Sequence, residues 1–255
     1  MRSDKRVGLL AVFSLDSAER YYKMNSSIVT RVLPVITILF GVTLVNSAIA
    51  GEPETVSSLL FDKPYLTSVK PDTTLVYDFK RISSDQKKYG EDLSDTIRLD
   101  VLKDEKDSSK RTAHLHIYSG PRARNIGPIP QTSGNPAIMI LLEQDTYDFK
   151  RHLGGIPAYF RNKIRKAMRD DAVIEQTRIQ YDGREVSGHR ITLVPFKGDP
   201  NMQRVPEYQD TIYEFIVSDE VPGGIVSISS TIPGSQSGSS ALRKQFMSFN
   251  SQVAK

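Results

Sequence analysis

Residues 208–232 read YQDTIYEFIVSDEVPGGIVSISSTI, and this stretch decides the fold class. Two runs rich in β-branched and aromatic residues flank the segment 218–223, which contains the turn formers Pro222 and Gly223. Such a pattern predicts two antiparallel strands joined by a turn. Residues 173–181 and 185–196 repeat the arrangement around Asp182-Gly183, a pair typical of tight hairpins because Gly tolerates a positive φ.

The first half of the chain shows the same strand signal as an alternation with a period of two residues. Every second residue is apolar at 75–80, 97–102 and 113–118, as in Leu75, Tyr77 and Phe79. Successive side chains of a strand point to opposite faces, so this period predicts a sheet with one buried and one wet face. Polar segments at 83–95 and 103–110 separate the runs, which favours an antiparallel meander.

Two segments interrupt the strand pattern. Residues 120–136, GPRARNIGPIPQTSGNP, hold three Gly and four Pro and predict a long loop that carries Arg122 and Arg124. The apolar run 137–142 fits either a buried strand or the start of a helix. Residues 143–171 are helical in pattern, divided by Gly154-Gly155, with Pro157 suited to the first turn of the second helix.

The second helix, residues 157–170, is amphipathic with an unusually basic polar side. Phe160, Ile164 and Met168 fall on its apolar face together with Ala167. Its cations, and the two arginines of the preceding loop, are the candidate ligand- or partner-binding residues: Arg122, Arg124, Arg161, Lys163, Arg165, Lys166 and Arg169. Five cations on one helix would suit anionic headgroups or another acidic surface. A solvated helix whose apolar stripe packs on the sheet is the favoured alternative.

Beyond the Gly/Ser-rich residues 234–240, the spacing of Leu242, Phe246, Phe249 and Val253 predicts a C-terminal helix. Neither group of strands is large enough to bury its own apolar face, so we expect both groups in one sheet. The predicted fold class is therefore α+β and β-rich. We expect a curved antiparallel sheet or half-barrel with an amphipathic helix pair inserted mid-chain and a C-terminal helix, as a single domain over residues 51–255.

The N-terminal segment predicts export. Residues 32–45, VLPVITILFGVTLV, carry no charge, Arg31 precedes them, and the following NSAIA ends in the Ala-x-Ala pattern of a signal peptide. We expect cleavage after Ala50, and Met24 as the true start, with residues 1–23 a start extension or a long n-region. An uncleaved anchor is the alternative, because residues 32–50 give nineteen uncharged positions.

Composition excludes several classes of function. The chain has no Cys, which rules out disulfides, zinc–thiolate sites, iron–sulfur clusters and thiol nucleophiles. It holds 34 basic and 30 acidic residues, but residues 1–50 contain six and three of these, which leaves 28 against 27. A nucleic-acid binder needs a surplus of positive charge, so no nucleic-acid partner is expected.

Catalytic and metal signatures are weak. His114 and His116 lie on one face of a predicted strand, about 6.6 Å apart, and with His189 or His152 they are weak metal candidates. A solvated polar face explains them as well. No catalytic residue is identified, no cofactor is expected, and enzymatic activity is left open with a non-enzymatic role favoured.

The strand–turn–strand segment 213–228, with IVSDEVPGGIVSI at its centre, and the strand–helix–strand layout resemble bacterial periplasmic half-barrel proteins of the lipoprotein-carrier kind. The resemblance implies a curved sheet that wraps helices and shelters acyl chains, and it carries no functional residue across. We therefore expect an exported periplasmic or secreted envelope protein that binds a lipidic or apolar ligand. A lipid, an anionic envelope component or the membrane surface is the expected partner. The alternatives are an interaction module using the basic helix, and a periplasmic hydrolase built from His114, His116 and His189.

Overall fold

The computed structural model describes residues 54–131, 133–234 and 238–255. The predicted start extension, signal peptide and cleavage after Ala50 lie outside these residues. Residues Thr55–Lys255 form one compact unit.

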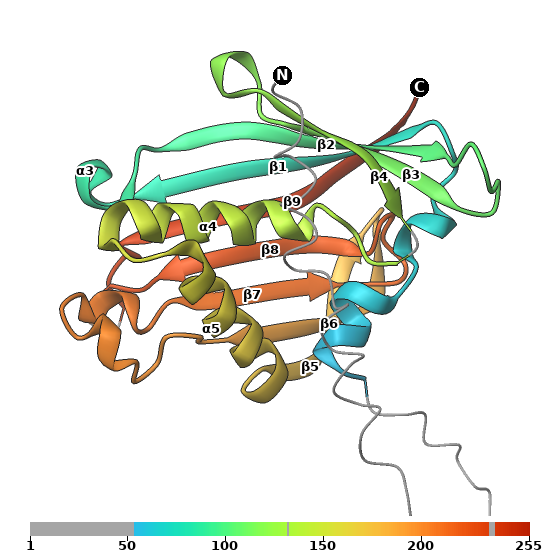
Figure 1. The fold of residues 1–255 in the computed structure, drawn as a ribbon. Helices are drawn as coiled ribbons and strands as arrows, with labels where there is room; N and C mark the ends of the chain where they lie inside the picture. The colour runs from blue at the N-terminus through green and yellow to red at the C-terminus, as the bar shows by residue number, and fades with distance from the viewer. Residues whose placement is uncertain (1–53, 132, 235–237) are drawn as a thin grey trace, which may run out of the picture. The chain divides into compact units, whose positions relative to one another are not determined.

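Nine antiparallel strands form one open sheet in the order β4-β3-β2-β1-β9-β8-β7-β6-β5 (Figure 1). The strands are β1 (Thr73–Ser83), β2 (Leu93–Lys103), β3 (Arg111–Ile117), β4 (Arg124–Gln131), β5 (Val173–Tyr181), β6 (Arg184–Leu193), β7 (Ile212–Val217), β8 (Ile225–Ile232) and β9 (Arg243–Ala254). Strands β1–β4 and β5–β8 are two meanders, and the C-terminal strand β9 joins them by pairing with β1 and β8. The predicted curved antiparallel sheet that unites both halves is confirmed.

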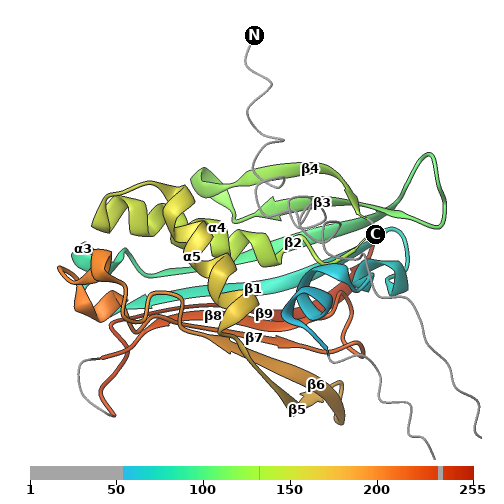
Figure 2. The same cartoon turned by 60° about the horizontal axis from the view of Figure 1, so that its bottom comes forward.

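Two helices pack on one face of this sheet (Figure 2). Helix α4 (Ile138–Leu153) lies over β8 and β9, and helix α5 (Pro157–Asp170) packs against α4. Gly154 ends α4 with φ +77°, and Pro157 begins α5 as predicted. The inserted helix pair is therefore confirmed, and the apolar run 137–142 is the start of α4. No helix among the described residues is long and apolar enough to cross a membrane.

The core lies between the sheet and α4. Inward residues of β1 and β2 such as Leu75, Tyr77 and Ile97 are fully buried, because the strand period places them all on the face that α4 covers. The segment before β1 also contributes: a π-helical turn at Ser58–Asp62 and a 3₁₀ turn at Tyr65–Ser68 bury Leu59 and Tyr65. The chain's own side chains thus fill the covered face of the sheet.

The predicted C-terminal helix is wrong, because residues 243–254 form strand β9. Arg243, Gln245 and Met247 point inward with exposed fractions of 1%, 0% and 0%. Two of these inward residues are polar. The alternation of apolar and polar residues that would predict a strand is therefore absent from the sequence of β9. Phe246 and Phe249, whose spacing suggested a helix, lie in continuous register opposite Lys80 and Tyr77 of β1. Being three residues apart in a strand, they point to opposite faces of the sheet.

The predicted long loop at 120–136 is also wrong in part. A 3₁₀ turn at Gly120–Arg122 leads into β4, which pairs only with β3 at the edge of the sheet. Pro128 and Pro130 have no N–H to donate, and an edge strand is the place in a sheet where that loss is tolerated. The hairpin prediction is confirmed: Asp182 and Gly183 have φ of +50° and +73° in the turn between β5 and β6.

Candidate functional site

A row of polar side chains crosses the otherwise apolar face beneath α4. Tyr213 of β7 pairs with Ser230 of β8, Ser230 pairs with Gln245 of β9, and Gln245 pairs with Arg81 of β1. These cross-strand neighbours lie on one face, and all four side chains are buried. Tyr213 carries a pKa raised well above its ordinary value because burial disfavours its charged form.

Helix α4 supplies two carboxylates to this row. Arg243 Nη2 lies 2.7 Å from Asp145 Oδ1, and Arg81 Nη2 lies 2.9 Å from Asp148 Oδ2. Arg81 Nε also donates to Gln245 Oε1 at 2.8 Å. Burial raises the pKa of Asp148, and the attraction of Arg81 and Arg243 offsets this only in part. Two ion pairs therefore tie α4 to β1 and β9 in the interior.

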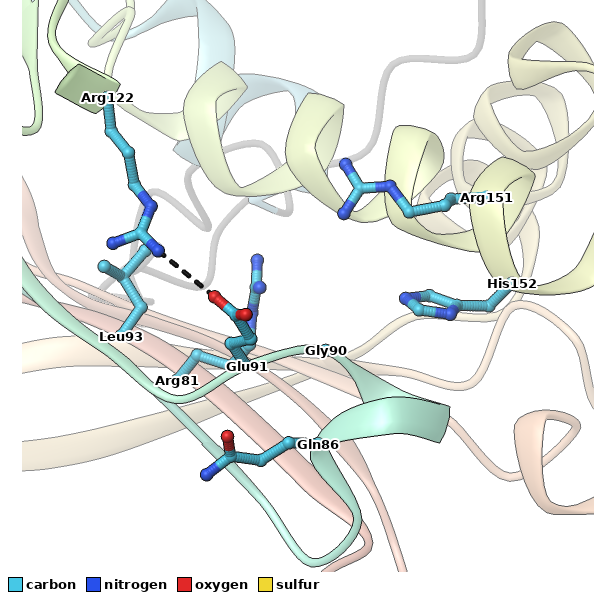
Figure 3. Close-up of a pocket in the computed structure, with 8 residues that line it drawn as sticks. All are labelled: Arg81, Gln86, Gly90, Glu91, Leu93, Arg122, Arg151 and His152. Atoms are coloured by element: carbon cyan, nitrogen blue, oxygen red, sulfur yellow. Dashed lines mark hydrogen bonds and ion pairs between the residues drawn. The ribbon is translucent and has the colours of Figure 1, made fainter.

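The row ends in a pocket beside the last turn of α4 (Figure 3). The pocket has a volume of about 380 Å³. Its lining comes from β1, from helix α3 (Gln86–Tyr89) and the two residues after it, from the start of β2, from the turn before β4, and from α4. The lining residues are Arg81, Gln86, Gly90, Glu91, Leu93, Arg122, Arg151 and His152.

The charges around the pocket are mainly positive. The lining residues include three arginines, Arg81, Arg122 and Arg151, and one carboxylate, Glu91. Arg122 Nη2 lies 3.3 Å from Glu91 Oε2, and these side chains are 56% and 75% exposed. Arg151 is 68% exposed, with Nη1 3.6 Å from Oδ1 of Asp148. The arginines at the mouth are thus only loosely paired with the chain's own carboxylates.

His152 adds a neutral polar group to the same wall. Burial lowers the pKa of its imidazole below the ordinary value, so the ring is uncharged at pH 7. Its Nε2 atom is buried and has no hydrogen-bond partner among the described residues. Figure 3 shows the side chains of Arg151 and His152 extending from α4 toward the side of the pocket that Gly90 and Glu91 form.

This arrangement suits the binding of an anion. Guanidinium groups donate parallel N–H bonds to carboxylate and phosphate oxygens, and three arginines line this pocket. The lining residues include no Ser, Thr, Tyr or Lys side chain.

The residues predicted to bind a ligand or partner lie in different parts of the structure. Arg122 lines the pocket, whereas Arg124 is an exposed residue of β4 outside the lining. On α5, Arg161 Nε lies 2.6 Å from Glu143 Oε1 and Lys163 Nζ lies 2.7 Å from Asp199 Oδ2. Further along α5, Asp170 pairs with Lys166 and Arg169, and Arg165 is half-buried. A partner-binding role for α5 stays a prediction, and its cations already have partners within the chain.

The predicted histidine set is dispersed. His114 and His116 lie on β3, while His189 lies on β6, with five strands between them in the sheet. His116 Nε2 lies 2.9 Å from Oδ2 of Asp100. Within the described ranges, no group of three or more His, Asp or Glu side chains is placed to hold a metal ion.

Sequence reasoning missed Arg81, Glu91 and Arg151. Arg81 continues the inward series Leu75, Tyr77 and Phe79, and an arginine at such a position is the available signal for a buried polar contact. Glu91 and Arg151 carried no local signal, because only the tertiary fold brings α3 beside the end of α4.

Comparison with known proteins identifies no family. No family model matches this sequence, and no curated protein gives a significant match. Among solved structures, the chain is similar to the lipoprotein LppX of Mycobacterium tuberculosis, with 8% identity and a TM-score of 0.28. That similarity covers 72% of this chain and 87% of the other. A TM-score this low carries no argument about fold or function.

Proposed function

We propose that the folded unit is a non-enzymatic binding module of the cell envelope that holds its ligand through an anionic group, a phosphate or a carboxylate. The observation that carries the proposal is the convergence of Arg81, Arg122 and Arg151 on one pocket of about 380 Å³. Arginine is the residue best suited to planar, bidentate recognition of such groups. The envelope location rests on the predicted signal peptide, which lies outside the described residues.

The lipidic ligand expected from the sequence is compatible with this pocket through its headgroup. The face of the sheet under α4 is filled by buried side chains such as Leu75, Tyr77 and Phe79. In this proposal the anionic group of the ligand occupies the pocket, and its acyl chains do not enter the interior under α4. A free small anion and an anionic amphiphile share this chemistry, and the experiment distinguishes them.

The test is calorimetric titration of the protein, expressed from the full-length gene, with inorganic phosphate and separately with octyl phosphate. Arg151→Gln removes one pocket cation. Arg169→Gln is the matched control, because Arg169 is 70% exposed against 68% for Arg151, and each lies near one carboxylate of its own helix. We expect Arg151→Gln to weaken binding about fivefold to tenfold, which corresponds to roughly 1–1.4 kcal/mol. Arg169→Gln should change affinity by less than about twofold.

Equal losses in the two variants would show that net charge, rather than the pocket, attracts the anion, and would refute the site. If neither inorganic phosphate nor octyl phosphate binds at millimolar concentration, the proposed function is refuted. Binding of octyl phosphate much tighter than inorganic phosphate would identify an amphiphile as the ligand class.

A further inference from the structure

The segment that carries Glu91 is fixed to the fold on both sides. Tyr89 is buried against Tyr208, with ring centroids 6.0 Å apart. Lys88 Nζ lies 2.7 Å from Glu207 Oε1. On the other side of Glu91, Asp92 Oδ1 accepts a hydrogen bond from the backbone N–H of Ser83 at 2.8 Å. The backbone at Glu91 is therefore held at the pocket, whatever its side chain does.

The side chain of Glu91, in contrast, is loosely held. It is 75% exposed, and the ion pair that the structure records for it joins Oε2 to Nη2 of Arg122 at 3.3 Å. Figure 3 shows the carboxylate lying between Arg122 and the side chains of α4. An exposed pair of this kind contributes little free energy, so a competing anion can replace it.

The other two arginines have a different counter-ion. Asp148 is 2.9 Å from Arg81 and 3.6 Å from Arg151, and its side chain is only 5% exposed. A buried carboxylate that also lies near Arg243 is fixed within the interior. Glu91 is therefore the pocket carboxylate that can leave its arginine without disturbing the core.

We propose that Glu91 is an internal counter-ion that occupies Arg122 in the free protein and is displaced by the anionic group of the ligand. This inference rests on the proposed function of the pocket and deepens it, because it assigns Glu91 the regulation of affinity. The carboxylate of Glu91 and the ligand compete for the guanidinium of Arg122. Weakly binding anions therefore fail to displace Glu91, whereas anions that also contact Arg81 and Arg151 displace it. Glu91 lowers affinity and raises selectivity.

The test is Glu91→Gln, titrated with inorganic phosphate by calorimetry. Glu185→Gln is the matched control, because Glu185 is 54% exposed and lies 3.8 Å from the exposed Arg178, away from the pocket. We expect Glu91→Gln to tighten phosphate binding about twofold to fivefold, as release of one exposed ion pair allows, and Glu185→Gln to change it by less than about 1.5-fold.

A double-mutant cycle separates competition from a general charge effect. In the Arg122→Gln background, the gain from Glu91→Gln should fall below about 1.5-fold, because the guanidinium that both anions seek is absent. An equal gain in both backgrounds would overturn the inference. So would unchanged or weaker binding by Glu91→Gln, provided that the wild-type protein binds phosphate. Failure of both proteins to bind phosphate would instead refute the proposed function, and this inference with it.

Discussion

Arg243 Nη2 of the C-terminal strand lies 2.7 Å from Oδ1 of Asp145 on α4, and the two side chains are 1% and 0% exposed. These residues are 98 positions apart in the chain. The pair ties the last strand of the sheet to the helix that covers it. It is linked to the pocket residue Arg81 through Asp148, which lies 3.8 Å from Arg243 and 2.9 Å from Arg81. Hence the stability of the interior and the position of Arg81 in the pocket both depend on the ion pairs that Asp145 and Asp148 form with Arg243 and Arg81.

Asp145→Asn should be strongly destabilising. It removes the carboxylate nearest to a fully buried guanidinium, and breaking a buried pair in this way typically costs about 3–5 kcal/mol. Asp170→Asn, which removes a carboxylate from the exposed end of α5, should cost less than about 1 kcal/mol. Urea denaturation at pH 7 measures both free energies of unfolding. A loss below about 1 kcal/mol for Asp145→Asn would contradict the buried pair.

His152 should make anion affinity depend on pH. Its pKa is lowered by burial, with Asp148 acting in the opposite direction and Arg151, Arg243 and Arg81 adding to the lowering. The imidazole is therefore neutral at pH 7 and gains its charge only as the pH falls through that lowered pKa. Charging adds one cation to the pocket wall, so affinity for an anion rises toward low pH.

Sulfate is the appropriate probe for this effect, because it stays a dianion across pH 5–8. From pH 7.5 to pH 5, affinity of the wild-type protein should rise about twofold to fivefold. In His152→Gln the rise should be largely absent. If both proteins gain affinity alike, another group titrates, and the assignment to His152 is refuted.

Gly90 should matter for the position of Arg81. Gly90 has φ of +94°, and a Cβ added there would lie 3.1 Å from Arg81 Nη1. Gly90→Ala should therefore lower stability by about 1 kcal/mol through backbone strain and weaken phosphate binding about threefold by pushing the guanidinium aside.

Gly154→Ala is the control for this variant. Gly154 has φ of +77° with nothing within 4 Å of an added Cβ, so it suffers similar strain without touching the pocket arginine. Calorimetry should find phosphate affinity unchanged in Gly154→Ala. The account fails on this point if both variants bind phosphate equally well.

The sequence predicted the fold correctly where the inward residues of a strand are apolar and recur at every second position. Leu75, Tyr77 and Phe79 alternate with Val76, Asp78 and Lys80, and β1 forms there with the first three side chains fully buried. The same period continues to Arg81, where a buried charge depends on Asp148, a partner 67 residues away. Local patterns contain no information on such a partner, so the pocket arginine was missed.

In strand β9, buried polar residues with distant partners caused a larger error in the prediction. Its inward Arg243 and Gln245 look like surface residues, so the apolar spacing of Phe246 and Phe249 predicted a helix. The partners of these two inward side chains are Asp145 and Asp148 of α4 and Arg81 of β1, which lie far from β9 in the sequence. Arg122, in turn, was named as a binding residue for its loop, but its pocket exists because β4 pairs with β3 and α3 lies opposite.

The central claim is that the pocket at the end of α4 binds an anionic group, and its most direct test is a backbone-amide NMR titration with octyl phosphate. The account predicts that the amide signals of Gly90, Glu91, Arg151 and His152 shift together with one dissociation constant. Shifts centred on α5 and leaving these four residues unmoved would contradict it, as would no shifts at millimolar octyl phosphate.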